Sequence, residues 1–315
     1  MSRITKEEIR QMAFQDEDIS QLDVSHIEDF SGVFQDLKNF NQDISNWDVS
    51  NGKDFSWMFF NCLNFNCDIS KWDVSNGKNF KGMFENCRRF NSDLSKWDVS
   101  KGEDFSGMFK KCKNFNSDLS NWDVSNCWDF NGMFWDCENF NCDISNWDVS
   151  NGEDFHGMFF SCQKFGGDLS RWNVSNGKNF AYILQGCKKF NGDISKWDVS
   201  NGKNFYSMFW GCEKFNSDIS NWNVSKGENF SYMFYDCENF NCDLSEWDVS
   251  AGRSFCCMFW GCKNFNRDLS NWDASNSESF SWVFRSTNIP KETLDRIYFA
   301  WKLKNKELPP LGDLT

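Results

Sequence analysis

Residues that could carry out acid–base or metal chemistry are scarce or isolated in this chain of 315 residues. Only two histidines occur, His26 and His156, and no candidate nucleophile or acid is tied to either by spacing, as catalysis would require. Pairs such as Cys62 and Cys67 could begin a zinc site, but the other two ligands are not apparent. We therefore expect no enzymatic activity, no catalytic residue, no bound metal and no cofactor.

The cysteines follow a repeat. From His26 to Ser275 the sequence recurs every 25 residues, without insertion or deletion, as residues 76–100 (NGKNFKGMFENCRRFNSDLSKWDVS) illustrate. We number positions 1–25 within each repeat, so that Asn76 is position 1. A fixed period of this length is typical of proteins built from stacked repeats. Nine of the 15 cysteines occupy position 12, where we expect them to be buried as small apolar residues.

Each repeat contains two apolar patterns. Positions 5, 8, 9 and 12 have the i, i+3, i+4, i+7 spacing of a short helical or 3₁₀ segment. Positions 22 and 24 (Trp97 and Val99 in residues 76–100) alternate with polar residues, as in a strand. These patterns predict an α/β repeat solenoid with one parallel sheet of about 11 short strands and helical or 3₁₀ returns. Aromatic residues at positions 5, 9, 15 and 22 should stack into ladders.

The ends of the chain differ from the repeats. Residues 1–25 predict a short amphipathic helix, begun by a capping box of Thr5 and Glu8, and then a degenerate strand. Residues 26–287 hold ten repeats and a partial last coil, and residues 288–315 hold a second helix and a tail. Both helices should cover the ends of the stack. We expect no signal peptide and no transmembrane segment.

The repeat resembles a known family. The run FNxDISxWDVSN, seen from Phe40 to Asn51, and the motif M-F-x-x-C-x-x-F are similar to the BspA-like class of leucine-rich repeat. The resemblance covers about residues 14–287. It implies a solenoid of strands and short helices with no enzymatic activity, found mostly in bacterial surface proteins. The sequence departs from that class at position 2, which is mostly glycine, as in Gly52 and Gly77.

The composition limits the classes of binding partner and the cellular compartment that we expect. The net charge of −13 and the absence of a basic stripe argue against nucleic acid and anionic membranes. The cysteines are odd in number and show no pairing pattern, which favours a reducing environment inside a cell or a particle. A cell-surface location is the alternative.

One candidate protein-binding face consists of aromatic residues at positions 7 and 10, opposite the apolar stripe. Exposed aromatic side chains in one zone are typical of interfaces. Alternatively, neighbouring coils clasp these rings between them. The candidates are Trp57, Phe60, Trp135, Phe160, Trp210, Tyr235 and Trp260, together with Tyr182, Tyr232 and Trp282.

The second candidate face is a row of carboxylates at position 23, predicted to point outward from the sheet. Stacked like charges repel, so the row needs compensation. Ion pairs with basic residues at position 21, such as Lys71 and Lys96, are one account, calcium is a second, and a basic protein partner is a third. The row consists of Asp48, Asp73, Asp98, Asp123, Asp148, Asp198, Asp248 and Asp273.

These patterns predict a non-enzymatic scaffold that mediates protein–protein interaction, for example as a structural component of a larger assembly or virus particle. An exported adhesin of the BspA-like type is the alternative. In both cases the partner is a protein, without nucleic acid and without insertion into a membrane.

Overall fold

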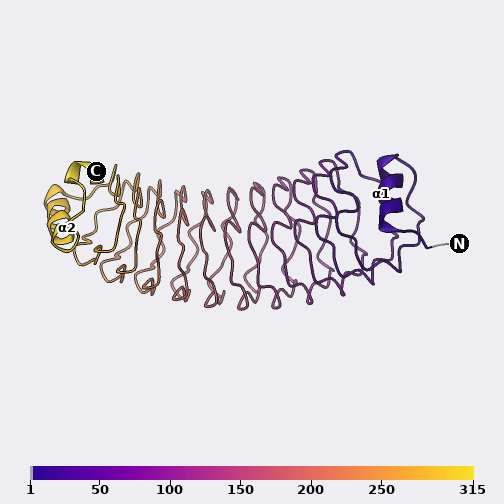
Figure 1. Ribbon diagram of the computed structural model, residues 1–315, viewed down its shortest axis with the longest axis horizontal. Helices are drawn as coiled ribbons and strands as arrows, with labels where there is room; N and C mark the ends of the chain where they lie inside the picture. Colours follow the sequence, from indigo (N-terminus) through magenta and orange to yellow (C-terminus); the bar gives the residue numbers. More distant parts are fainter. Residues whose placement is uncertain (1–2) are drawn as a thin grey trace. The chain divides into compact units, whose positions relative to one another are not determined.

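The computed structural model describes residues 3–315 (Figure 1). It contains helices α1 (Lys6–Phe14), α2 (Lys291–Lys304) and α3 (Leu311–Leu314). The chain divides into two compact units, Met1–Gly152 and Glu153–Thr315, called unit 1 and unit 2 below. Within each unit, successive coils of 25 residues lie side by side.

The predicted parallel sheet does not form in residues 3–315. Parallel pairing is reduced to single-residue bridges at position 4, such as Asp54 with Asn79 in unit 1. Where strands were expected, the backbone turns: the N–H of Trp97 donates to the carbonyl of Leu94 at 3.1 Å, within its own coil. The predicted leucine-rich-repeat-like solenoid, with about 11 strands, helical or 3₁₀ returns and helical caps, is therefore wrong. The alternation of Trp97 and Val99 with polar residues reflects which side chains are buried. A turn can bury alternate side chains as well as a strand can.

The segment predicted to be helical links neighbouring coils instead. In unit 1, N–H groups at positions 5, 7, 9 and 11 donate to carbonyls at positions 4, 6, 8 and 10 of the next coil. An α-helix would use these groups internally. For residues 76–100 the bonds are Phe80 to Asp104, Gly82 to Ser106, Phe84 to Met108 and Asn86 to Lys110, all between 2.7 and 2.9 Å.

Positions 7 and 11 have a left-handed backbone, which also excludes a helix. The φ angle is 56° at Gly82 and 63° at Asn86, and it is positive at both positions in every coil from Gly32 to Ser286. Glycine is the residue that adopts this conformation without strain. Unit 1 has glycine at position 7 in four of five coils, whereas unit 2 has it only at Gly157.

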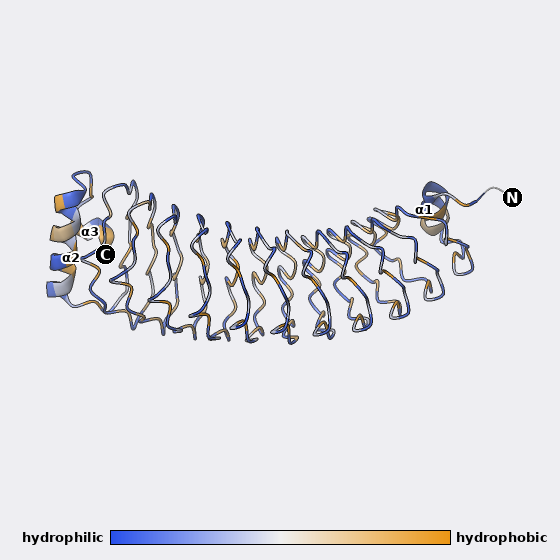
Figure 2. Cartoon of the chain, turned by 90° about the horizontal axis from the view of Figure 1, so that it is seen from below, coloured by the Kyte–Doolittle hydropathy of each residue, from blue (hydrophilic) through white to orange (hydrophobic). Residues whose placement is uncertain are grey.

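The core of each unit is built from the predicted ladders, which the structure confirms. Phenylalanines at positions 5, 9 and 15 and tryptophans at position 22 are buried in both units. Equivalent rings are nearly parallel: Trp97 and Trp122 in unit 1 have centroids 6.5 Å apart and planes 1° apart. Figure 2 shows the resulting rapid alternation of apolar and polar residues along the coils.

Two side chains of most coils also bond the backbone of the preceding coil. The indole N–H of Trp97 donates to the carbonyl of Ile69 at 3.0 Å, and the thiol of Cys87 donates to the carbonyl of Phe59 at 2.9 Å. Unit 2 repeats the arrangement, for example with Trp222 and Ile194 at 3.0 Å. Each of these carbonyls also accepts a backbone N–H of its own coil, so the side chain supplies a second hydrogen bond that links neighbouring coils.

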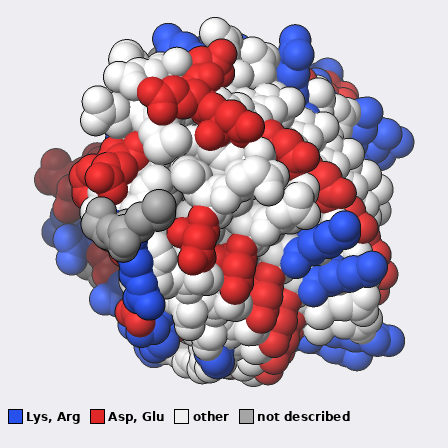
Figure 3. All heavy atoms as spheres, turned by 90° about the vertical axis from the view of Figure 1, so that its right-hand side faces the viewer, with Lys and Arg blue, Asp and Glu red and all other residues white. Residues whose placement is uncertain are grey.

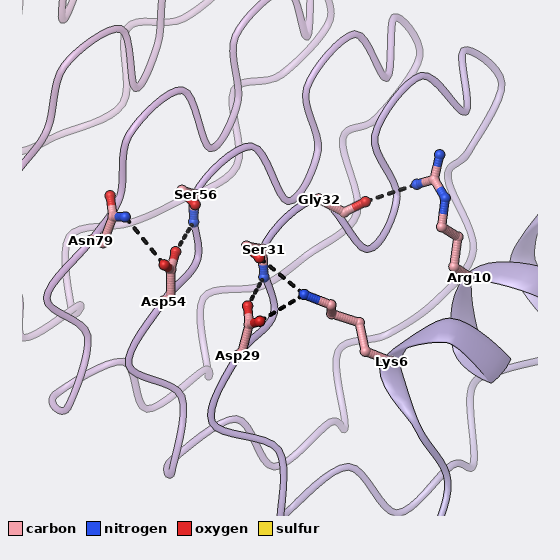
Figure 4. A network of polar contacts seen from close by, with 8 residues as sticks. All are labelled: Lys6, Arg10, Asp29, Ser31, Gly32, Asp54, Ser56 and Asn79. Atoms are coloured by element: carbon pink, nitrogen blue, oxygen red, sulfur yellow. Dashed lines mark hydrogen bonds and ion pairs between the residues drawn. The ribbon is translucent and has the colours of Figure 1, made fainter.

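Helix α1 packs on the first coils of unit 1. Its predicted capping box forms, with Thr5 and Glu8 each accepting from the backbone N–H of the other. The ammonium of Lys6 lies 2.7 Å from the carboxylate of Asp29, and the guanidinium of Arg10 donates to the carbonyl of Gly32 at 2.8 Å (Figure 4). Arg10 also donates to the carbonyls of Val33 and Gln35 at 3.2 and 2.9 Å. These two residues occupy positions whose carbonyls accept from the preceding coil elsewhere in unit 1.

Candidate functional site

Eight aromatic side chains form a continuous strip on unit 2, called the aromatic strip below. They occupy positions 6, 7 and 10 of successive coils, and each ring contacts at least one other, with centroids 4.8–6.1 Å apart. The strip consists of Phe160, Tyr182, Tyr206, Trp210, Tyr232, Tyr235, Trp260 and Trp282.

The rings of the aromatic strip are partly accessible. Trp282 is 44% exposed, and the other seven are half-buried. Neighbouring coils do clasp these rings, since Trp210 contacts Tyr232 and Tyr235 of the next coil at 5.5 and 4.8 Å, yet each ring keeps part of its surface accessible. The sequence analysis missed Tyr206, because position 6 lies outside the two positions considered. Its signal was an aromatic residue at a position where serine is the commonest residue.

Three of the predicted aromatic residues lie in unit 1 and do not belong to the strip. Trp57 is 40% exposed and carries the ammonium of Lys81 over its ring at 5.7 Å. Trp135 is half-buried, with the ammonium of Lys110 5.8 Å from its centroid. Phe60 is half-buried as well. A lysine ammonium thus lies over the ring in two of these three residues, all of which lie outside the strip.

Part of the strip lies on a strained backbone, a feature that it shares with Trp57 in unit 1 and with position 11 of most coils. Tyr182, Tyr232 and Trp282 occupy position 7 with φ of 61°, 59° and 55°. A bulky residue in this left-handed region costs roughly 1–2 kcal/mol relative to an ordinary backbone. Unit 1 mostly avoids this cost with glycine. The strip therefore holds aromatic residues where the backbone itself favours glycine.

The electrostatics of the strip are set by one cation and several neutral phenols. The guanidinium of Arg285 lies 4.7 Å from the ring centroid of Trp260 and 5.7 Å from that of Trp282. Burial raises the pKa of Tyr182 and of Tyr232 above the usual value. Both phenols thus stay protonated near neutral pH and can donate hydrogen bonds.

The carboxylates at position 23 are exposed, as predicted, but they have a local structural role. The carboxylate of Asp98 accepts from the N–H of Ser100 at 3.0 Å, which closes a turn. Asn173 and Asn223, which interrupt the row of aspartates, accept from Ser175 and Ser225 at 3.1 Å in the same way. The remaining members, Asp48, Asp73, Asp123, Asp148, Asp198, Asp248 and Asp273, make the same bond.

Ion pairs between coils use other positions than the row of aspartates. In unit 1 they join position 3 to position 3, as in Lys78 with Glu103 at 2.8 Å, and position 13 to position 13, as in Lys113 with Glu138 at 2.6 Å. Figure 3 shows acidic side chains aligned in rows on one face. No cluster of three or more histidine, cysteine or acidic side chains suited to a metal ion occurs in residues 3–315. The hydrogen bond to serine, present also with asparagine, is the feature that all ten coils share.

The remaining candidates lie apart from the aromatic strip or are buried. All nine position-12 cysteines are buried and free, and burial raises the pKa of thiols such as Cys87 well above its usual value. In unit 1, His26 Nε2 lies 2.9 Å from the carbonyl oxygen of Ile4. Within residues 3–315, no helix has both the length and the apolar character needed to cross a membrane.

Comparison with known families identifies the chain as a repeat protein. The family described as "Mycoplasma protein of unknown function, DUF285" matches three overlapping stretches, residues 3–121, 103–213 and 193–297. No curated protein matches the sequence. The three stretches together span nearly all coils of both units. The chain therefore belongs to the DUF285 repeat family.

Proposed function

We propose that the protein is a non-enzymatic repeat scaffold that binds a protein partner through the aromatic strip of unit 2. One observation carries the proposal: eight aromatic rings from successive coils form one contiguous, partly accessible strip, with neighbouring centroids 4.8–6.1 Å apart. Accessible aromatic side chains gathered in one zone are typical of a protein interface. Tyr182, Tyr232 and Trp282 also occupy a left-handed backbone position that glycine fills in most of unit 1, a cost that Trp57 bears outside the strip as well.

The chemistry of the strip fits protein recognition. Tyrosine and tryptophan offer a large contact area with little loss of side-chain entropy, and they are enriched in the cores of interfaces. Contacts to neighbouring rings hold Trp210 and Trp260 in place before a partner arrives. Arg285 at one end of the strip adds a positive charge, and arginine is, like the aromatic residues, enriched in interfaces.

We further infer that the repeats are of the BspA-like type, on the strength of the recurring FNxDISxWDVSN run. We also propose a reducing location inside a cell or a particle. Its support is the set of 15 free cysteines, of which 14 are buried and Cys256 is half-buried. An exported adhesin would instead be cleaved when intact cells of the native source are treated with protease, and that result would overturn the location.

The binding proposal is tested with a double variant, Trp210→Ser with Trp260→Ser, and a matched control, Trp128→Ser. Trp128 is 50% exposed in unit 1 and lies outside the strip. Immobilised full-length proteins are incubated with extract of the native source, and captured proteins are identified by mass spectrometry. We expect a partner captured by the wild type and by Trp128→Ser, and lost from the double variant.

The stability of the double variant is measured in parallel, because both rings contact their neighbours. Each lost aromatic pair should cost about 0.5–1.5 kcal/mol, which leaves the fold intact in a chain of this size. Equal capture by all three proteins would overturn the proposal and turn attention to the face that carries Asp48–Asp148.

A further inference from the structure

Two consecutive cysteines lie beneath the aromatic strip. Cys256 and Cys257 occupy positions 6 and 7 of coil 251–275, and no other coil has adjacent cysteines. Both are free thiols, and their sulfur atoms are 3.5 Å apart. Cys256 is half-buried, whereas Cys257 is only 1% exposed and has φ of 55°. The pair thus combines one accessible thiol with one buried thiol within contact distance.

Charged and polar neighbours surround this pair. The phenol of Tyr232, a member of the aromatic strip, interacts electrostatically with both thiols. The positive charge of Arg285 favours the thiolate of Cys257, although burial has the larger effect and raises the pKa of that thiol. Reactive cysteines are typically part-exposed, and a second thiol nearby resolves the oxidised form. Cys256 is the part-exposed thiol, and Cys257 supplies the second thiol.

We propose that Cys256 and Cys257 form a reversible oxidation site, at which a hydroperoxide converts the vicinal dithiol to a disulfide. The Cys256 sulfur attacks the terminal peroxide oxygen, the O–O bond breaks, and the sulfur becomes a sulfenic acid while the remaining oxygen leaves as water or an alcohol. The Cys257 sulfur then attacks the sulfenic sulfur, the S–S bond forms and water leaves. Two thiols are oxidised by two electrons, and one peroxide is reduced.

Geometry makes this disulfide easy to reduce. Adjacent α-carbons are about 3.8 Å apart, whereas ordinary disulfides join α-carbons separated by roughly 4.4–6.8 Å. The bond between Cys256 and Cys257 is therefore strained, and strained disulfides have higher reduction potentials. A small thiol such as dithiothreitol should restore both cysteines. The site would act as a reversible switch rather than as a structural bond.

Oxidation would also alter the aromatic strip. Disulfide formation removes both thiol protons and moves the two sulfurs toward each other, which changes the surroundings of the Tyr232 hydroxyl. Tyr232 stacks on Trp210 with centroids 5.5 Å apart, and that contact lies at the centre of the strip. We expect weaker partner binding by the oxidised protein. This consequence rests on the proposed function, whereas the oxidation chemistry does not.

The test uses the reduced full-length protein and hydrogen peroxide at one to a few molar equivalents. Remaining thiols are alkylated, the protein is digested, and the peptide containing both cysteines is analysed by mass spectrometry. We expect a loss of two hydrogens from this peptide with no alkyl group added, and its reversal by dithiothreitol. The thiols of Cys67, Cys142 and Cys242 at position 17, which are 7–9% exposed and have no adjacent cysteine, provide the internal comparison and should remain alkylated.

Two variants separate the roles of the thiols. Cys257→Ser removes the resolving thiol, so that Cys256 should accumulate a sulfenic acid that dimedone traps. Cys256→Ser removes the accessible thiol and should make Cys257 unreactive. Alkylation of both cysteines after peroxide treatment of the wild type would overturn the proposal. So would conversion of Cys256 to a sulfonic acid while Cys257 remained a free thiol.

Discussion

The indole of Trp301 in α2 lies parallel to that of Trp272, with ring centroids 6.0 Å apart and planes 5° apart. Its N–H donates to the carbonyl of Leu269 at 3.0 Å, just as that of Trp272 donates to the carbonyl of Leu244 at 2.8 Å. Trp301, although it belongs to a helix, thus continues the ladder of stacked tryptophans that the coils of unit 2 form. The last coil is completed by a side chain 29 residues away, outside the repeat of 25.

Replacing Trp301 should destabilise unit 2 strongly. The residue is fully buried, and Trp301→Ala should cost about 3–5 kcal/mol, because it leaves a cavity and removes one of the two hydrogen bonds to the carbonyl of Leu269. Phe299→Ala is the matched control, since Phe299 belongs to the same helix and is 66% exposed. Chemical denaturation monitored by circular dichroism measures both. Equal stability of the two variants would show that α2 does not contribute to the ladder.

The position-12 cysteines should resist labelling in the folded protein. Each is buried, and burial raises the pKa of thiols such as Cys87, Cys187 and Cys237 well above the usual value, so the reactive thiolate is rare. A maleimide should modify few of the nine in the native state and all of them in guanidinium chloride. Mass spectrometry after timed quenching counts them. Rapid labelling of most of these cysteines without denaturant would contradict the burial.

The turn at position 23 should depend on an oxygen acceptor more than on a charge. Asp98→Asn keeps the acceptor for the N–H of Ser100, as Asn173 and Asn223 do naturally, and should cost less stability than removal of the acceptor. Asp98→Ala removes it and should cost about 0.5–1.5 kcal/mol. Urea denaturation of both variants provides the comparison. If the asparagine variant were as unstable as the alanine variant, the charge would be the feature that matters.

Stability should fall as the solution becomes acidic. Hydrogen bonds from the hydroxyl and the amide of Ser100 lower the pKa of Asp98, and the equivalent serines lower those of Asp198 and Asp248. A carboxyl group whose pKa is lower in the folded state than in the unfolded state stabilises the folded protein at pH values above its unfolded-state pKa of about 3.9. That contribution disappears as the pH falls through about 4 toward the folded-state pKa. Denaturation curves between pH 2 and 6 should show the loss.

The matched variant for this pH dependence combines Asp98→Asn, Asp198→Asn and Asp248→Asn. Its stability should fall less steeply below pH 4, because three of the titrating groups are gone. An unchanged slope would show that other carboxylates cause the acid sensitivity.

Trp57 offers a test of the left-handed backbone. Its φ is 53°, so Trp57→Gly relieves strain, whereas Trp57→Ala keeps it and loses the same ring contacts. The glycine variant should be more stable than the alanine variant by about 1 kcal/mol. At Trp128, where φ is not positive, the order should be the reverse. Thermal denaturation of the four variants measures both differences. If the alanine variant were the more stable one at Trp57 as well, the left-handed backbone at that position would be contradicted.

Burial could be predicted from the sequence, but backbone pairing could not. The spacing of Phe80, Phe84 and Cys87 correctly placed these side chains in the core. The same spacing led to a helix, because period alone does not distinguish a helix from a series of tight turns. Gly82 was the contrary signal, and its positive φ explains why glycine recurs at position 7. Hydrogen bonds between coils, such as Phe84 to Met108, depend on neighbours that one repeat does not reveal.

The candidate site was predicted in part. Phe160, Trp210, Tyr235 and Trp260 were expected on one surface, and the structure brings them together in unit 2. Sequence position could not show that Trp57 and Trp135 lie beside lysines in the other unit. The row of aspartates was interpreted as charge in need of compensation, whereas hydrogen bonds to serine explain it. Local bonds from a side chain to its own backbone leave no long-range pattern in a sequence.

The hydrogen bonds from the tryptophans at position 22 and the cysteines at position 12 to the preceding coil span 28 residues, for example from Trp97 to Ile69 and from Cys87 to Phe59. Each bond is satisfied by whichever coil precedes it, provided that the coil has the same length. Loss or duplication of a whole repeat within a unit preserves every such pairing, whereas insertion or deletion of one residue shifts the register of all side chains in that coil. The number of coils in such a unit can therefore change by whole repeats without redesign of the core.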